Sequence, residues 1–156
     1  MKHTLLIITA LLFITSSVIP QSKMNINNLV EYGDKKYAPN DDEPYTGKVF
    51  DFYENGQKKL DGRYRKGLMT GKWTYYHKNG QISEQGSFID GDGSYPDVVP
   101  DSLKSKLAPI DGRSGRWTAW YENGQKEYEG TYKDGERDGK WIWYNEDGSV
   151  KEVKKY

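Results

Sequence analysis

The sequence of 156 residues contains no cysteine. This absence excludes a disulfide framework, a thiolate metal site and a cysteine nucleophile. Histidine is scarce as well: only His77 lies beyond the first twenty residues, and a lone histidine without a nucleophile beside it cannot form a catalytic triad. Net charge is also lacking, because 23 basic residues balance 23 acidic ones. No overall field attracts nucleic acid or an acidic membrane, so we expect no nucleic-acid partner.

The chain is instead rich in aromatic residues and glycine. Aromatic residues make up 14% of it, with 13 tyrosines, and there are 17 glycines. In a polar chain, this combination favours many short strands joined by tight turns rather than helices.

The first twenty residues differ from the rest of the chain. Lys2 and His3 give a basic start, an apolar run covers residues 5–13, and polar residues follow at 15–17. This order is typical of a secretory signal peptide, and the run is too short to span a bilayer. We therefore expect residues 1–20 to be a signal peptide, and the mature chain to be periplasmic, cell-surface or secreted, with no membrane span left. An uncleaved anchor is the alternative.

An internal repeat organises the rest of the chain. Asn–Gly or Asp–Gly pairs recur at intervals of 24, 44 and 24 residues, and a second glycine series recurs at 24 and 44. The pairs end at Gly56, Gly80, Gly124 and Gly148, and the second series is Gly62, Gly86 and Gly130. The spacing predicts four repeats, at about 45–69, 70–91, 114–137 and 138–156, with an inserted loop at about 92–113.

Each repeat has the pattern of a β-hairpin. In the second repeat, residues 72–77 are rich in strand formers, Asn79–Gly80 suits the positive φ angles of a tight turn, and residues 81–89 return as a second strand. A single hairpin is marginally stable in water, because its apolar face has nothing to pack against. The predicted fold class is therefore all-β, an elongated antiparallel sheet of stacked hairpins.

The two faces of the predicted sheet carry different aromatic columns, because side chains alternate along a strand. The second glycine series lies on the same face as the aromatic residues two positions later in its strand, and we infer that these glycines leave room for a neighbouring ring to lie flat over the backbone. One face of the sheet receives the structural tryptophans. These residues are Trp73, Trp117 and Trp141, with Val49 in the first repeat. The other face is the candidate partner-binding surface, since tyrosine and tryptophan suit interfaces. Its candidate residues are Phe52, Tyr76, Trp120 and Tyr144.

The repeat unit, G-K-W-x-x-[YW]-x-x-N-G-Q-x-x-x-x-G-x-[YF]-x-x-G, resembles the bacterial variant of the MORN repeat. The resemblance covers about residues 45–156 apart from the insertion, and residues 29–47 are similar to the lead-in common in that family. It implies an elongated sheet of hairpins, a role in protein interaction or scaffolding, and no catalytic residues. Chains of this kind are often described as antitoxins of toxin–antitoxin pairs, which implies an antitoxin or immunity-type function as an alternative.

The segments outside the repeats have weaker signals. Residues 21–28 are polar and are expected to form a linker, whereas residues 29–37 could form a short hairpin that caps the edge of the sheet. Residues 38–44 are expected to form an acidic loop. Three prolines disfavour a strand in the insertion, which is either a functional loop or a tolerated one.

No motif indicates catalysis, a metal or a cofactor. Residues 90–94 are similar to the start of a calcium loop, but Tyr95 and Asp101 stand where glycine and glutamate are required. Carboxylates such as Glu54 and Glu122 repeat at the hairpin tips instead of pairing in a cleft. We therefore expect an exported, non-enzymatic protein that binds a protein partner. A carbohydrate- or cell-wall-binding module that uses the aromatic columns is a further alternative.

Overall fold

A computed structural model describes residues 23–89 and 112–156 of the chain. The expected signal peptide, the segment similar to a calcium loop and most of the expected insertion lie outside these residues. The described elements, in chain order, are β1 (Lys23–Asn25), the 3-10 helix η1 (Ile26–Asn28), β2 (Val30–Tyr32), β3 (Lys35–Tyr37), β4 (Gly47–Phe52), β5 (Lys58–Arg65), β6 (Leu68–Met69), β7 (Gly71–Tyr76), β8 (Ile82–Phe88), β9 (Arg113–Trp120), β10 (Lys126–Lys133), β11 (Glu136–Tyr144) and β12 (Val150–Lys155).

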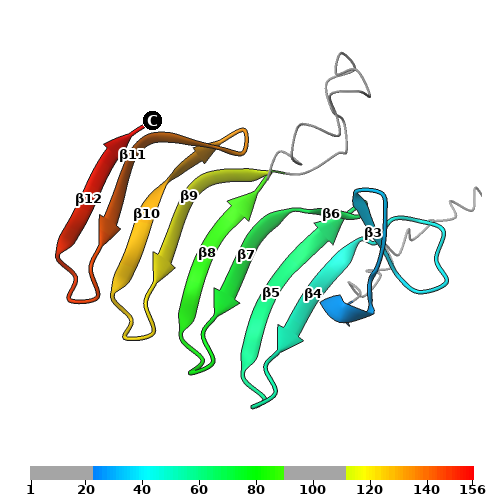
Figure 1. The fold of residues 1–156 in the computed structure, drawn as a ribbon. Coiled ribbons are helices and arrows are strands. Elements are labelled where there is room, and N and C mark those ends of the chain that lie inside the picture. The colour runs from blue at the N-terminus through cyan, green and yellow to red at the C-terminus, as the bar shows by residue number, and fades with distance from the viewer. Residues whose placement is uncertain (1–22, 90–111) are drawn as a thin grey trace, which may run out of the picture.

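One long sheet carries most of these strands, in the order β1-β4-β5-β7-β8-β9-β10-β11-β12, with β6 paired to β5. Figure 1 shows the strands side by side in a single layer. Four hairpins follow one another in this sheet: β4–β5, β7–β8, β9–β10 and β11–β12. The predicted fold class, an elongated all-β sheet of stacked hairpins, is confirmed. The sheet differs from the prediction in one pair, since β1 runs parallel to β4.

The hairpin turns follow from the Asn–Gly pairs. In the second hairpin, Gly80 has a φ of 86°, in the left-handed region that glycine tolerates well. The backbone N–H of Gly80 donates to the oxygen of His77 at 2.9 Å, and the N–H of His77 donates to the oxygen of Gln81 at 2.8 Å. The side-chain oxygen of Asn79 accepts from the N–H of Gln81 at 2.9 Å, which closes the turn locally.

The core consists of tryptophan rings that lie on glycine. A Cβ atom added to Gly86 would lie 2.0 Å from the ring of Trp117, and Gly62 stands in the same relation to Trp73 at 2.2 Å. Gly130 faces Trp141 in the same way, also at 2.2 Å. The three tryptophans are at most 1% exposed. The expectation that these glycines make room for a flat ring is therefore confirmed.

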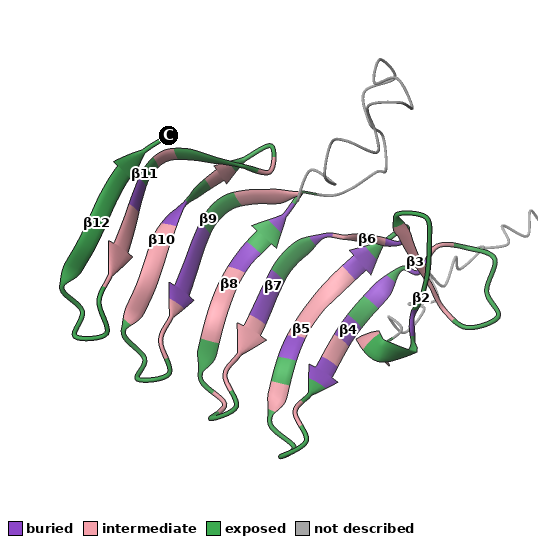
Figure 2. Ribbon diagram, in the orientation of Figure 1, coloured by how far each residue is buried: buried purple, intermediate pink, exposed green. Residues whose placement is uncertain are grey.

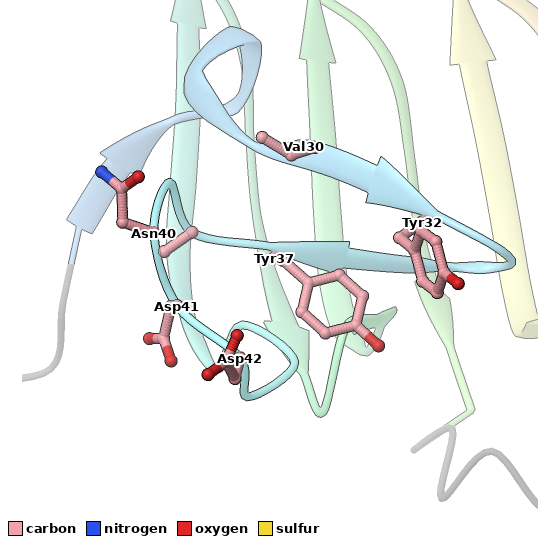
Figure 3. A pocket seen from close by; sticks show the side chains of 7 residues that line it. Val30, Tyr32, Tyr37, Asn40, Asp41 and Asp42 are labelled. Carbon is pink, nitrogen blue, oxygen red and sulfur yellow. The ribbon is translucent and has the colours of Figure 1, made fainter.

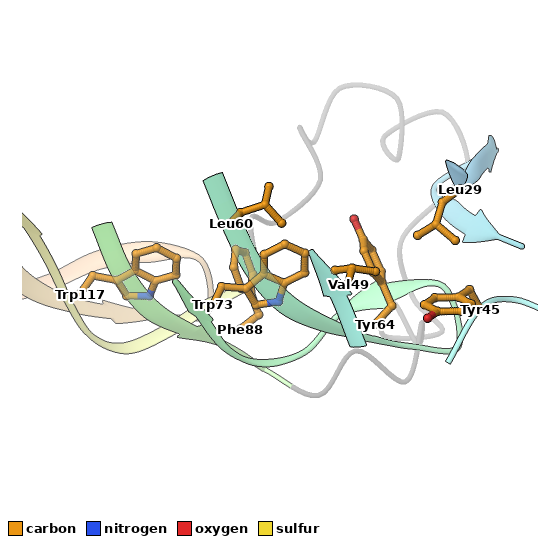
Figure 4. Packing of buried hydrophobic residues seen from close by; sticks show 8 residues of the cluster. All are labelled: Leu29, Tyr45, Val49, Leu60, Tyr64, Trp73, Phe88 and Trp117. Carbon is orange, nitrogen blue, oxygen red and sulfur yellow. The ribbon is translucent and has the colours of Figure 1, made fainter. Parts of the chain in front are cut away.

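The tryptophans are also linked edge-on to one another through tyrosine and phenylalanine. Phe88 lies between Trp73 and Trp117, with ring centroids 5.9 and 5.3 Å away and steep interplanar angles of 75° and 90°. Such edge-to-face contacts stabilise beyond the area that the rings bury. The same face continues with Tyr64, Tyr132, Trp141 and Tyr156. Figure 4 shows the N-terminal part of this packing, where Val49 occupies the column of the tryptophans.

The N-terminal edge of the sheet is covered by a segment that was expected to be a linker. Residues 23–25 form β1, which pairs with β4, and η1 follows directly. Met24 packs against the core, and Asn27 donates to the carboxylate of Asp51 at 2.9 Å. The β2–β3 hairpin, in the region expected to cap the sheet, forms a separate two-stranded sheet. The edge of β4 is thus paired with β1 and not with the hairpin.

Side chains at each turn bond to the following hairpin. The Nδ2 atom of Asn79 donates to the backbone oxygen of Glu122 at 2.9 Å, and Nε2 of His77 donates to the oxygen of Trp120 at 2.6 Å. His77 therefore has a structural role. The equivalent bonds run from Asn55 to Lys78, from Asn123 to Glu146, from Tyr53 to Tyr76 and from Tyr121 to Tyr144.

The fourth hairpin differs at the positions that would bond to a further one. Asp147 stands in the asparagine column and has no amide donor, and the Nδ2 atom of Asn145 donates to Ser149 within its own turn. Lys154 stands in the column of the glycines that receive a tryptophan. In the described sheet β12 has no hairpin beyond it. These three positions therefore lack the donors and the glycine through which the first three hairpins contact the hairpin that follows them.

Replacing Gly86 by alanine tests the tryptophan–glycine packing. The added methyl group would overlap a buried ring, so we expect the free energy of unfolding to fall by about 3 kcal/mol. The control is Lys154→Ala, at the position of the fourth hairpin that is equivalent to Gly86. It should change the free energy of unfolding by less than about 0.5 kcal/mol. Urea unfolding measures both. An equal effect of the two substitutions would contradict the proposed packing.

The substitution Asn79→Asp tests the bond between hairpins, because it keeps the acceptor of the turn and removes the amide donor to Glu122. We expect the free energy of unfolding to fall by about 1 kcal/mol. The reverse change in the fourth hairpin, Asp147→Asn, adds a donor that faces no further hairpin among the described residues, and should be neutral within about 0.5 kcal/mol. Thermal unfolding compares the two variants. If Asn79→Asp were neutral, the bond from Asn79 to Glu122 would contribute nothing to stability.

Candidate functional site

The sheet has two chemically different faces. We call the side that carries Trp73, Trp117 and Trp141 the tryptophan face, and the other side the open face. In β4 the two alternate: Val49 and Asp51 on the tryptophan face are buried, whereas Phe52 on the open face is 49% exposed. Figure 2 shows this alternation as bands along β4 and β5.

The four candidate partner-binding residues occupy equivalent positions on the open face. Each stands at the end of the first strand of its hairpin and is at least partly exposed. Each is paired across the hairpin with a residue of the second strand. The pairs are Phe52 with Lys58, Tyr76 with Ile82, Trp120 with Lys126 and Tyr144 with Val150. The structure thus brings the four predicted residues into one row across the sheet.

A charged cluster supports this row between the first two hairpins. Lys58 Nζ lies 2.6 Å from the carboxylate of Asp61, and the hydroxyl of Tyr76 donates to the same carboxylate at 3.2 Å. Lys58 Nζ also lies 5.4 Å from the centre of the Tyr76 ring, in cation–π range. One side of this ring is therefore occupied by a side chain of the protein itself.

A second charged cluster occupies the equivalent place between the last two hairpins. Lys126 Nζ lies 2.8 Å from Glu129, the hydroxyl of Tyr144 donates to Glu129 at 2.7 Å, and Arg116 forms an ion pair with the same carboxylate. The hydrogen bond from Lys126, together with those from Arg116 and Tyr144, lowers the pKa of Glu129 from 4.5 to about 2 against the opposing effect of burial. The bond that Tyr144 donates raises the pKa of Tyr144.

The junction between the second and third hairpins lacks this cluster. Ile82 stands where the other junctions have lysine, and Gln85 stands where they have an acid. Ile82 is 37% exposed, and Gln85 donates to the hydroxyl of Thr74 at 3.1 Å. Trp120, the largest aromatic residue of the row, belongs to this junction. The centre of the open face is thus neutral and apolar between two charged clusters, an arrangement that is typical of an interface with a central anchor.

Ile82 was not identified in the sequence analysis, because the aromatic and glycine columns of the repeat were compared and not the column that contains Ile82. Aligning the second strands on the same 24- and 44-residue intervals places Ile82 in one column with Lys58 and Lys126. The sequence therefore shows an apolar residue in a column that otherwise contains lysine. Its place on the open face follows only from the pairing of Ile82 with Tyr76.

The tryptophan face is covered by arginine as well as by rings. The guanidinium of Arg113 lies 4.2 Å from the centre of the Trp117 ring and forms an ion pair with Glu84 at 3.1 Å. Burial, and then the hydrogen bond donated to Glu84, raises the pKa of Tyr128. Arg137 repeats this position one period later, 4.8 Å from the centre of the Trp141 ring. The tryptophan face therefore serves as core, and its arginine column is a structural feature that the sequence analysis did not identify.

A depression of 390 Å³ lies beside the β2–β3 hairpin, lined by Val30, Tyr32, Tyr37 and the loop after β3 (Figure 3). Tyr32 is 79% exposed, and its ring packs edge-on against Tyr37 with centroids 6.3 Å apart. Over residues 23–89 and 112–156, no group of three or more histidine and acidic side chains could hold a metal ion. In those ranges no helix is long and apolar enough to cross a membrane.

Comparison with known families supports the repeat assignment. Residues 69–90, 113–134 and 137–156 match the family described as MORN repeat variant. These segments correspond to the second, third and fourth hairpins, so three of the four hairpins are similar to this repeat. The match does not include the β4–β5 hairpin, which has Val49 in place of tryptophan although Gly62 still receives Trp73. No curated protein and no solved structure matches the chain.

The cluster around Glu129 predicts a pH-dependent contribution to stability. Because the folded-state pKa of about 2 lies below the ordinary value of 4.5, the contribution is present above pH 4.5 and is lost as the pH falls towards 2. Glu129→Gln should therefore lower the free energy of unfolding at pH 7 by about 1–2 kcal/mol. This value is smaller than the pKa shift alone would give, because solvent screens the exposed basic partners of Glu129. The difference from the wild type should shrink on acidification.

Urea unfolding at pH 7 and at pH 3 measures this difference. The control is Glu54→Gln at an exposed hairpin tip, which should leave stability within about 0.5 kcal/mol at both pH values. A Glu129→Gln deficit that is as large at pH 3 as at pH 7 would refute an electrostatic origin.

Proposed function

We propose that this protein is an exported, non-catalytic binding module whose partner is a protein, and that it binds this partner through the open face, centred on Trp120 and Ile82. The single observation that carries the proposal is the apolar centre of that face between two charged clusters. The MORN-type repeats support a binding role, and the basic start and apolar run of residues 2–13 support export.

The different side chains of the two faces support the open face as the binding surface. The tryptophan face is occupied by its own rings and by Arg113 and Arg137, so few of its aromatic groups remain for a partner. On the open face, Phe52 and Ile82 are exposed and Trp120 is half-buried. Tryptophan, tyrosine and arginine are the residue types enriched where protein interfaces derive most of their energy.

A carbohydrate ligand is supported less well by the geometry. Stacking on a sugar requires open ring faces, but Lys58 lies over the ring of Tyr76. The hydroxyls of Tyr76 and Tyr144 are bonded to Asp61 and Glu129, which holds both rings within the charged clusters. An antitoxin function rests on the family resemblance alone, and no contact in the structure favours it over another protein partner.

A capture experiment tests the proposal. The mature chain is used as bait in culture-medium and cell-envelope fractions, and any retained protein is identified by mass spectrometry. We expect the double substitution Trp120→Ala and Ile82→Ser to reduce retention of a specific partner by about tenfold or more, because the central anchor is lost.

The control is Tyr32→Ala, which removes a highly exposed aromatic residue outside the open face. It should retain the partner as the wild type does, and urea unfolding verifies that all variants remain folded. Loss of the partner by the control alone, or undiminished capture by the double variant, would reject the open face as the binding surface.

A further inference from the structure

A row of basic side chains crosses the open face at the end away from the hairpin turns. In each of the four hairpins, the residue before the valine or tryptophan of the core column is basic and exposed. These four residues are Lys48, Lys72, Arg116 and Lys140. Because they alternate with buried residues of the tryptophan face, they share the face that carries Phe52, Tyr76, Trp120 and Tyr144.

At the two ends of the sheet, neighbouring strands add further basic residues to this row. Lys48 pairs directly with Arg63 on one side and with Lys23 of β1 on the other. At the opposite end of the sheet, Lys140 pairs directly with Lys155. Like charges at directly opposed positions destabilise a sheet, so the fold itself does not account for this placement. We define the cation row as Lys48, Arg63, Lys72, Arg116, Lys140 and Lys155.

The acidic residues that balance the total charge lie mainly elsewhere. Glu54, Glu122 and Glu146 are exposed at the hairpin turns. On the open face, Asp61 and Glu129 are held by the lysines of the two clusters, and Glu129 also forms an ion pair with Arg116. Two further acids, Glu136 and Asp138, lie on this face at the start of β11, opposite Lys133 and Thr131. The zero net charge of the chain therefore conceals a local excess of positive charge beside the aromatic row.

We propose that the cation row binds an acidic segment of the protein partner, while Trp120 and Ile82 bind its apolar part. This inference rests on the proposed function, since both parts belong to the open face. Successive hairpins are about 10 Å apart, because neighbouring strands lie about 4.8 Å apart. An acidic chain that crosses the hairpins meets one basic side chain at each of them, and charge complementarity selects it over neutral or basic surfaces.

Charge reversal tests the cation row. The variant Lys72→Glu/Lys140→Glu is compared with Lys78→Glu/Lys154→Glu, which changes the net charge equally outside the open face. Lys78 lies at a hairpin turn, and Lys154 lies on the tryptophan face with its Nζ 5.8 Å from the centre of the Trp143 ring. Because Lys140→Glu would place a carboxylate opposite Lys155, the first variant should be at least as stable as the wild type in urea, which separates a loss of binding from unfolding.

The probe is poly-L-glutamate, and its affinity is measured by isothermal titration calorimetry at low and moderate salt. We expect the cation-row variant to bind about tenfold more weakly or worse, and the control variant to bind like the wild type. No binding by the wild type, or an equal loss in both variants, would overturn the proposal. Binding of polygalacturonate, an anionic polysaccharide, in preference to poly-L-glutamate would also overturn it, because the ligand class would then be a glycan.

The same variants separate this inference from the proposed function. If the cation-row variant loses the captured partner as Trp120→Ala/Ile82→Ser does, the inference is supported. If only the aromatic variant loses the partner, the open face remains the binding surface and the cation row is rejected. If neither variant loses it, both proposals fail.

Discussion

The structure depends on the stacking of each tryptophan on a glycine of the preceding hairpin. A single sheet has no second layer to cover its apolar side chains, and a lone hairpin would leave its rings in water. Trp117 avoids this exposure by lying flat over Gly86 with Phe88 edge-on beside it, and is 0% exposed as a result. Each ring needs the hairpin before it, so stability arises from contacts between neighbours, as in other repeat proteins.

This packing assigns different tasks to the two faces of the sheet. One face is used for stability by tryptophan, tyrosine and arginine, and the bonds at the turns fix the distance between hairpins. The open face needs to contribute less to the core, so its residues can differ between hairpins without loss of the fold. Ile82 and Gln85 are such a difference, since the equivalent positions on either side carry Lys58 with Asp61 and Lys126 with Glu129. The proposed binding surface is therefore centred on positions at which the open face departs from the repeat.

Much of this architecture could be predicted from the sequence, because a 24-residue period fixes which residues become neighbours. The shared row of Phe52, Tyr76, Trp120 and Tyr144 and the presence of a ring over each glycine of the second series followed from period and alternation, whereas the identity of those rings as Trp73, Trp117 and Trp141 came from the structure. The pairing of β1 with β4 did not, because a three-residue strand without a repeat has no periodic signal. The charge segregation was also missed, since the sum over the chain is zero whereas the sheet sorts charges by face.

Equivalent junctions between hairpins differ in some of their hydrogen bonds. These differences could not be predicted from the sequence, because they depend on the path of the backbone. Nε1 of Trp117 donates to the oxygen of Ser87 at 3.2 Å, whereas Nε1 of Trp73 is buried without a hydrogen-bond partner among the described residues. The equivalent oxygen, that of Arg63, accepts instead from the N–H of Thr70 at 2.9 Å. Thr70, which directly follows the short strand β6, thus bonds to this acceptor in the first junction, and only the backbone path reveals it.

Hydroxyl-radical footprinting of the mature chain, alone and with its captured partner, tests the central claim most directly. We expect protection of Trp120, Ile82 and Tyr76 on the open face, and unchanged reactivity of Tyr32 and of the depression beside the β2–β3 hairpin. Protection confined to Tyr32 and its surroundings, with Trp120 as reactive as in the free chain, would contradict it.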